Sequence, residues 1–126
     1  MEGINKFPEQ YSILKCAFEV QNTLKHGYLE SVYEVALEHE LLQNGFSVRR
    51  QVRIPVFYKG VELKKDFYAD MMVGDILIEL KAVTRLNSTH EKQIISYLKC
   101  TGMQKGLLLN FGHPRNLEWR SYNLQP

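Results

Sequence analysis

The chain changes its hydrophobic period along its length, and its first third has the period of a helix. Apolar residues recur every three or four positions over residues 9–42. His26 and Gly27 interrupt the pattern, and Gly27 is expected to stop the first helix. Asn44-Gly45 is expected to end the second. The apolar positions of the two predicted helices are Ile13, Leu14, Ala17, Val20 and Leu24, and then Val32, Tyr33, Ala36, Leu37 and Leu41.

Residues 47–83 alternate with a period of two, which predicts strands. Lys59-Gly60 and Gly74-Asp75 are typical of two-residue hairpin loops. These loops would pair Tyr58 with Val61 and Val73 with Ile76, and they set every other pairing. The expected core face, spoiled only by Lys65, is Val52, Ile54, Val56, Tyr58, Val61, Leu63, Phe67, Ala69, Met71, Val73, Ile76, Ile78, Leu80 and Ala82. The opposite face is Arg53, Phe57, Glu62, Lys64, Asp66, Tyr68, Asp70, Met72, Leu77, Glu79 and Lys81.

The last third predicts one more helix and two more strands. Ser88-Thr89-His90-Glu91 has the pattern of a capping box, and Gly102 is the expected stop of the helix that it opens. Residues 106–111 form an apolar run that suits a strand buried on both faces. Residues 117–124 alternate weakly, as an edge strand does. The order helix, helix, three strands, helix, strand, strand predicts an α/β (α+β) fold.

Composition agrees with a single domain over residues 1–126. Hydrophobic residues make up 44% and charged residues 24%, and the net charge is +2, which permits nucleic-acid binding without requiring it. The start of the chain lacks the apolar run of a signal peptide, and no stretch suits a membrane span. Cys16 and Cys100 show no metal-ligand spacing, so we expect a cytoplasmic protein with reduced thiols and no membrane partner.

Three charged residues gather on the polar face of the predicted hairpin. Its register places Asp70 directly opposite Glu79, and Lys81 shares the face of Glu79 because residues two apart on a strand point the same way. Carboxylates about 5 Å apart repel each other. Mg²⁺ (or Mn²⁺) would convert that repulsion into ligation, with the carbonyl of Leu80 as a further ligand. A metal held there activates water and stabilises charge on a phosphate, so the pattern indicates phosphodiester hydrolysis, with Lys81 orienting the water or contacting the phosphate.

The same charges have a simpler interpretation as a solvated sheet face that contains a Glu–Lys pair. Tyr68, Met72 and Leu77 share the face, which argues against free solvation. Asp66 and Asp75 are rival acids, but Asp75 is expected in a loop, where aspartate is common. Both interpretations stay open on spacing alone.

Further candidates come from the predicted helices. Glu30 shares a helix face with Tyr33 and Leu37, where it is either a helix-edge residue or a group that reaches the metal directly or through water. Gln93 and Tyr97 stand one helical turn apart and are equally explained as a solvated residue and a core residue.

Two cations fall on the face of Asp70 in the predicted register. Arg53 and Lys64 could contact phosphates of a nucleic acid, and each is equally explained as solvated surface. The sequence does not indicate an oligomeric state.

The ordered set of motifs resembles the GxxExxY family of small bacterial and archaeal proteins, which is placed within the PD-(D/E)xK nuclease superfamily. The motif itself is Gly27-Tyr28-Leu29-Glu30-Ser31-Val32-Tyr33. It is followed by Asp70, by Glu79-Leu80-Lys81, by QxxxY from Gln93 to Tyr97, and by GLLLNFG at 106–112. The resemblance extends over residues 11–112.

The resemblance implies a restriction-endonuclease-like core of helix, three antiparallel strands, helix and strand. In such nucleases the positions of Asp70 and Glu79 bind the metal, and that of Lys81 is catalytic. A glutamate on the first core helix, here Glu30, assists metal binding, and a helical QxxxY motif supports the active site. Ala69 replaces the proline that names the superfamily, at a position that carries no ligand.

The sequence therefore predicts a metal-dependent nuclease that hydrolyses phosphodiester bonds in nucleic acid, with DNA as the expected substrate. Gln93, Tyr97 and Tyr33 are the expected supporting residues. The alternative function is a non-catalytic module that binds nucleic acid or a partner on a nuclease-like fold.

Overall fold

The structure is a computed structural model that describes residues 8–124. Two helices come first, and the remaining elements follow in the predicted order, with one short ribbon added. The helices are α1 (Pro8–Leu24), α2 (Glu30–Gln43) and α3 (Ser88–Thr101). The strands are β1 (Arg49–Ile54), β2 (Phe57–Tyr58), β3 (Val61–Glu62), β4 (Phe67–Val73), β5 (Ile76–Lys81), β6 (Lys105–Asn110) and β7 (Glu118–Asn123).

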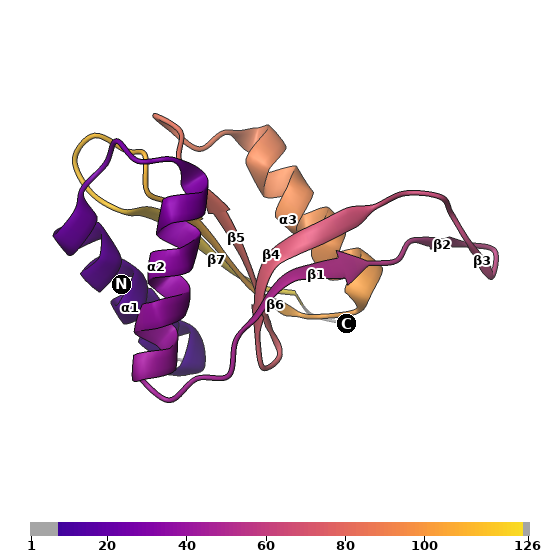
Figure 1. The fold of residues 1–126 in the computed structure, drawn as a ribbon. Helices are drawn as coiled ribbons and strands as arrows, with labels where there is room; N and C mark the ends of the chain where they lie inside the picture. The colour runs from indigo at the N-terminus through magenta and orange to yellow at the C-terminus, as the bar shows by residue number, and fades with distance from the viewer. Residues whose placement is uncertain (1–7, 125–126) are drawn as a thin grey trace.

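Five strands form one mixed sheet in the order β1-β4-β5-β6-β7. The pair β5–β6 is parallel and is connected through α3, whereas the other neighbouring strands are antiparallel. Helices α1 and α2 cover one face of the sheet and α3 covers the other (Figure 1). β6 is buried on both faces and β7 lies at an edge, as the sequence predicts. The predicted α+β class and restriction-endonuclease-like arrangement are confirmed.

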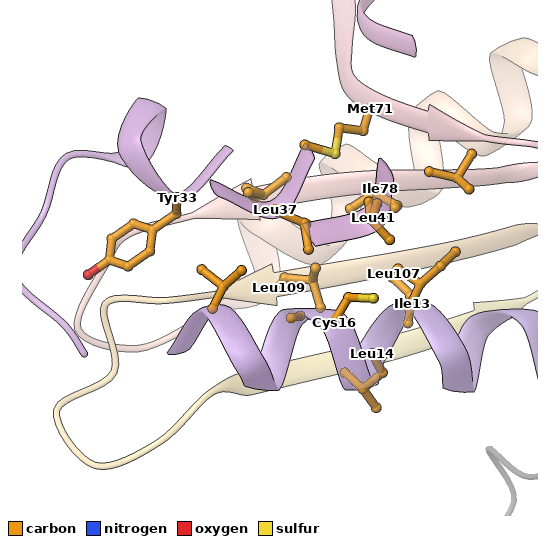
Figure 2. Packing of buried hydrophobic residues seen from close by; sticks show 14 of the residues in the cluster. Ile13, Leu14, Cys16, Tyr33, Leu37, Leu41, Met71, Ile78, Leu107 and Leu109 are labelled. Carbon is orange, nitrogen blue, oxygen red and sulfur yellow. The ribbon is translucent and has the colours of Figure 1, made fainter. Parts of the chain in front are cut away.

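The larger core lies between the sheet and the first two helices. Its side chains come from both helices and from the inner strands (Figure 2). The helical spacing read from the sequence therefore identifies the buried faces of α1 and α2. Labelled members of this core are Ile13, Leu14, Cys16, Tyr33, Leu37, Leu41, Met71, Ile78, Leu107 and Leu109.

A second core lies under α3, and it corrects the predicted core face. Val52, Ile54 and Ala69 pack in this second core and not with Met71. The change of side occurs where Gln51 takes a left-handed φ of 52° between two ladder pairs. A left-handed residue breaks the alternation of a strand, so the side chains beyond it face α3.

The first hairpin is also displaced from its predicted place. Tyr58 pairs with Val61 as predicted, but β2 and β3 form a separate ribbon outside the main sheet. The β1–β4 pairing, Ile54 with Phe67, does not continue the ribbon's register. Predicted core residues on the ribbon are exposed for this reason, with Tyr58 at 60% and Val61 at 63%.

Two helix ends differ from their predicted residues, and a third agrees. α1 ends before Lys25, which takes a left-handed φ of 61°, two residues before the predicted stop at Gly27. The capping box of α3 uses Asn87 and His90, because the Asn87 side chain reaches the His90 N–H, and not Ser88 and Glu91. Gly102 caps α3 in the left-handed conformation, as predicted.

The end of β5 is held by a close approach of the chain after β6. A Cβ on Gly112 would lie 2.5 Å from backbone atoms of Ala82 and Val83, so only glycine fits there. The buried Asn110 side chain accepts hydrogen bonds from the N–H groups of Val83 and Gly112. Phe111 N–H donates to the Lys81 carbonyl at 2.9 Å, which fixes the backbone of Lys81.

The sequence predicts reduced thiols and no membrane-spanning segment. Cys16 and Cys100 are both free thiols. Among residues 8–124, no helix has the length and apolar character needed to cross a membrane.

Candidate active site

The second hairpin has the predicted register and brings the two acids together. Val73 pairs with Ile76, and Met71 pairs with Ile78. The next pair in this register is Asp70 and Glu79, and there side chains replace the backbone ladder. Asp70 N–H donates to Glu79 Oε1 at 3.0 Å, and Leu80 N–H donates to Asp70 Oδ2 at 2.8 Å. The strands part at this point, and each carboxylate binds the backbone of the opposite strand.

Ionisation of the acid pair is unfavourable in the protein without a metal. Glu79 is 2% exposed, and burial, followed by the nearby charge of Asp70, raises the pKa of its carboxyl to about 8. Burial also raises the pKa of Asp70, against the hydrogen bond from Leu80 N–H. Within residues 8–124, no lysine or arginine forms an ion pair with either carboxylate. The site thus holds buried carboxylates whose charge is incompletely balanced.

Lys81 is connected to the two supporting residues on α3. Its Nζ donates to Gln93 Oε1 at 2.8 Å, and Gln93 Nε2 donates to Tyr97 Oη at 3.3 Å. Gln93 and Tyr97 lie one turn apart on the helix face that meets the sheet. The charge of Lys81 also opposes the rise in pKa of both Asp70 and Glu79. Lys81 therefore contributes to the same electrostatic site as the acids while Gln93 fixes its amine.

Glu30, the first residue of α2, belongs to the same electrostatic site. Desolvation raises the pKa of its carboxyl, the charge of Asp70 raises it further, and Lys81 opposes this rise. The Glu30 residue as a whole is exposed, whereas Glu79 is buried. The structure thus brings together Glu30, Asp70, Glu79, Lys81 and Gln93 from three separate parts of the chain.

The donor chemistry of this site suits a hard divalent cation. Glu30, Asp70 and Glu79 supply carboxylate oxygens, and Leu80 lies between Glu79 and Lys81 with a carbonyl oxygen to add. Burial, and after it the charge of a neighbouring carboxylate, raises the pKa of each of these three carboxyls, and a bound cation would favour their ionised forms. In the described part of the chain, however, no group of three or more His, Cys, Asp or Glu side chains has already converged into a metal site.

Tyr33 has a structural place away from the acid pair. Its ring is buried and stacks on Phe111, with ring centroids 4.8 Å apart. Its hydroxyl donates to the Lys25 carbonyl at 2.5 Å and accepts from Tyr28 N–H at 3.2 Å. Tyr33 therefore closes the loop that leads into Glu30, and its contact with the site is indirect.

Arg53 and Lys64 are not joined to the acid pair. The guanidinium of Arg53 contacts Glu62 at 3.1 Å and Asp66 at 3.9 Å. Lys64 lies on the exposed segment between β3 and β4. The structure places both cations beside the β2–β3 ribbon.

An ion-pair network around the buried carboxylate of Glu34, behind Asp70, was not predicted from the sequence. Glu34 Oε2 accepts hydrogen bonds from Arg50 Nε at 3.0 Å and Nη2 at 2.7 Å. Gln51 Nε2 donates to Glu34 Oε1 at 3.0 Å and lies 3.5 Å from Asp70 Oδ1. Glu34 follows Glu30 by one helical turn, and that spacing was an available signal. The sequence contains no comparable signal for the left-handed backbone conformation of Gln51, which directs its side chain toward Glu34.

Replacing Glu34 by glutamine is expected to destabilise the protein by about 2–3 kcal/mol, because Arg50 loses a buried charged acceptor. Urea denaturation measures the change. Glu38→Gln is the matched control, since Glu38 contacts the same Arg50 at 3.4 Å but is more exposed, and a change below about 0.5 kcal/mol is expected there. Equal losses of stability in the two variants would contradict the conclusion that Glu34 is the principal acceptor of Arg50.

Comparisons with known proteins identify the family and the fold. A model of the PD-(D/E)XK nuclease superfamily matches residues 8–122, which include every candidate residue described above. No curated protein matches significantly. The crystal structure of SSO0001 has a similar fold, with a TM-score of 0.59 and 21% identity over 76% of this chain. The match covers 50% of SSO0001, so this chain spans about half the length of that protein. Because the family match extends over nearly the whole chain, the protein belongs to the PD-(D/E)XK nuclease superfamily.

Proposed function

We propose that the protein is a metal-dependent nuclease that hydrolyses phosphodiester bonds in nucleic acid, with DNA as the substrate, and that it belongs to the GxxExxY group of its superfamily. The observation that carries the proposal is the opening of the β4–β5 hairpin. There the Glu79 carboxylate accepts from Asp70 N–H, the Asp70 carboxylate accepts from Leu80 N–H, and Lys81 lies two residues beyond Glu79 on β5.

The proposed ligands of Mg²⁺ or Mn²⁺ are the carboxylates of Asp70, Glu79 and Glu30 and the carbonyl of Leu80. A cation bound there supplies an acidified water and charge stabilisation at the phosphate. Burial of Glu79 keeps its carboxylate poorly hydrated, which favours exchange of a proton for a metal ion. Since Glu79 and Asp70 each bind the opposite strand, their oxygens are held by the backbone before a metal arrives.

The proposed role of Lys81 is to place its positive charge against the scissile phosphate or its attacking water. Gln93 accepts one hydrogen bond from the Lys81 amine, and this bond fixes the position of the amine. The other N–H groups of Lys81 remain for a substrate oxygen. Tyr97 binds the amide of Gln93 and so sets its orientation. These two are positioning residues, and Tyr33 supports the loop before Glu30.

Cleavage of single-stranded, duplex and branched DNA, and of RNA, tests this function. We expect cleavage of at least one substrate with Mg²⁺ or Mn²⁺ and none in EDTA. Asp70→Asn should lower the rate by about 100-fold or more, because it removes a metal ligand while retaining the Oδ atom near Leu80 N–H. If purified wild-type and Asp70→Asn proteins cut equally, the activity comes from a contaminant and the proposal fails.

The second candidate function is a non-catalytic module that binds nucleic acid or a protein partner. It is favoured by the lack of a converged group of three metal-ligating side chains among the described residues. Calorimetric titration with Mn²⁺ separates the two functions. Binding that is lost in Asp70→Asn supports the nuclease, and no heat of binding supports the module.

A further inference from the structure

The β2–β3 ribbon forms an arm that projects from the sheet beyond α3 (Figure 1). Phe57 and Tyr58 on the arm are 62% and 60% exposed. The ribbon pairs only two residues from each strand, so it has no core of its own to bury these rings. Aromatic rings held open on a short ribbon are available for stacking.

The arm is also basic. Lys59, Lys64 and Lys65 are exposed, and none of them forms an ion pair with a described residue. The Lys59 Nζ lies 5.5 Å from the centre of the Tyr58 ring. Arg53 contacts both acids of the arm, Glu62 and Asp66, so the three lysines and Arg53 outnumber the acids by two.

A groove of about 530 Å³ separates the base of the arm from α3. Phe57 lies on the arm side, and Lys92, Ser96 and Lys99 lie on the α3 side. These three α3 residues follow one another at helical spacing and form a stripe of two cations and a hydroxyl. No ion pair among residues 8–124 uses either lysine.

The groove and two supporting residues of the proposed active site share helix α3. Gln93 and Tyr97 occupy the neighbouring stripe of the same helix, one residue beyond Lys92 and Ser96. The rings of Phe67 and Tyr97 lie 5.7 Å apart and connect the base of the arm to that stripe. One helix, α3, therefore carries both the lysines of the groove and the residue that holds Lys81.

We propose that this groove binds an unpaired strand of the nucleic acid, with a base stacked on Phe57 and phosphates contacted by Lys92 and Lys99. The proposal rests on the proposed nuclease function and names the form of its substrate. Aromatic faces with interspersed cations are the elements by which proteins hold single strands, because every unpaired base offers a face and every nucleotide a phosphate. A duplex keeps its base faces stacked internally, and a purely apolar partner would leave the lysines without counter-charges.

Binding is measured by fluorescence anisotropy with a labelled single-stranded DNA of about 16 nucleotides, in EDTA so that metal-dependent cleavage does not interfere. We expect Phe57→Ala to weaken binding at least about fivefold and Phe57→Leu to do nearly the same, because leucine retains the apolar bulk without a ring. Phe57→Trp should retain binding. Lys92→Ala and Lys99→Ala should each reduce the slope of log affinity against log salt by about 0.7, whereas Lys15→Ala, on exposed α1 surface, should not.

The outcomes separate this inference from the nuclease proposal. Weaker binding in the Phe57 and lysine variants, with unchanged circular dichroism melts, supports the groove even if the protein cuts nothing. Cleavage by wild-type protein together with unchanged binding in these variants overturns the groove and leaves the nuclease. Tighter binding of a matched duplex, no binding of DNA, or an oligomer that dissociates in Phe57→Ala also overturns it.

Discussion

Lys81→Ala is expected to lower the rate of metal-dependent cleavage by about 100- to 10,000-fold, the largest effect of any single substitution that leaves the metal ligands in place. The reason is geometric. The Lys81 amine is held by Gln93 at 2.8 Å, on the face of β5 that carries Glu79. In the proposed mechanism, alanine there removes a fixed positive charge from the place where charge builds on the phosphate. Single-turnover cleavage at saturating DNA measures the loss.

The experiment needs a control for charge and one for position. Lys15→Ala removes a lysine that is exposed on α1, and this variant should cut at the wild-type rate. Gln93→Ala retains the lysine and frees its amine, so a smaller loss is expected, about tenfold. Unchanged cleavage in Lys81→Ala would remove this residue from the mechanism. A loss that is matched by a lower melting temperature would indicate a folding defect instead.

The register at the centre of the site could be predicted because local chemistry determines it. A two-residue Gly74-Asp75 loop leaves one choice of partner for Val73, and the pleat then aligns Asp70 with Glu79. Helical spacing identified the buried faces of α1 and α2 for the same reason. Each of these features depends on residues close together in the sequence.

The parts that could not be predicted depend on contacts between distant segments. The alternation of β1 gave no sign of the left-handed φ at Gln51, which moves Val52 and Ile54 to the core under α3. That conformation brings the Gln51 amide to Glu34 and Asp70, contacts that the helix and strand patterns do not encode. The predicted register of the first hairpin is correct, but its strands β2 and β3 lie outside the main sheet. The reason is that β1 and β4 pair with a different offset from that of β2 and β3.

Glu79→Gln is expected to stabilise the metal-free protein at alkaline pH by on the order of 3 kcal/mol. The pKa of Glu79 is raised from 4.5 to about 8 in the folded state, so between these values the folded protein binds more protons than the unfolded chain. Stability therefore falls as pH rises from about 4.5 to about 8 and then levels off. Glutamine retains the oxygen that accepts from Asp70 N–H and removes the charge, so this fall should be reduced.

Urea denaturation in EDTA at about pH 5, 7 and 9 measures the effect, because this range covers most of the interval between the unfolded and folded pKa values of Glu79. Glu19→Gln, on exposed α1 surface, is the control and should follow the wild-type curve. Adding Mg²⁺ at the highest pH should stabilise the wild type, because the cation binds only the folded protein, and should stabilise Glu79→Gln much less. If the free energy of unfolding depends on pH in the same way for wild type and Glu79→Gln, ionisation of Glu79 does not destabilise the folded protein. If Glu79 lowers the free energy of unfolding without a metal and Mg²⁺ restores it, Glu79 is best explained as a metal ligand. A carboxylate with a purely structural role would instead be expected to have a positively charged or hydrogen-bonding partner within the protein.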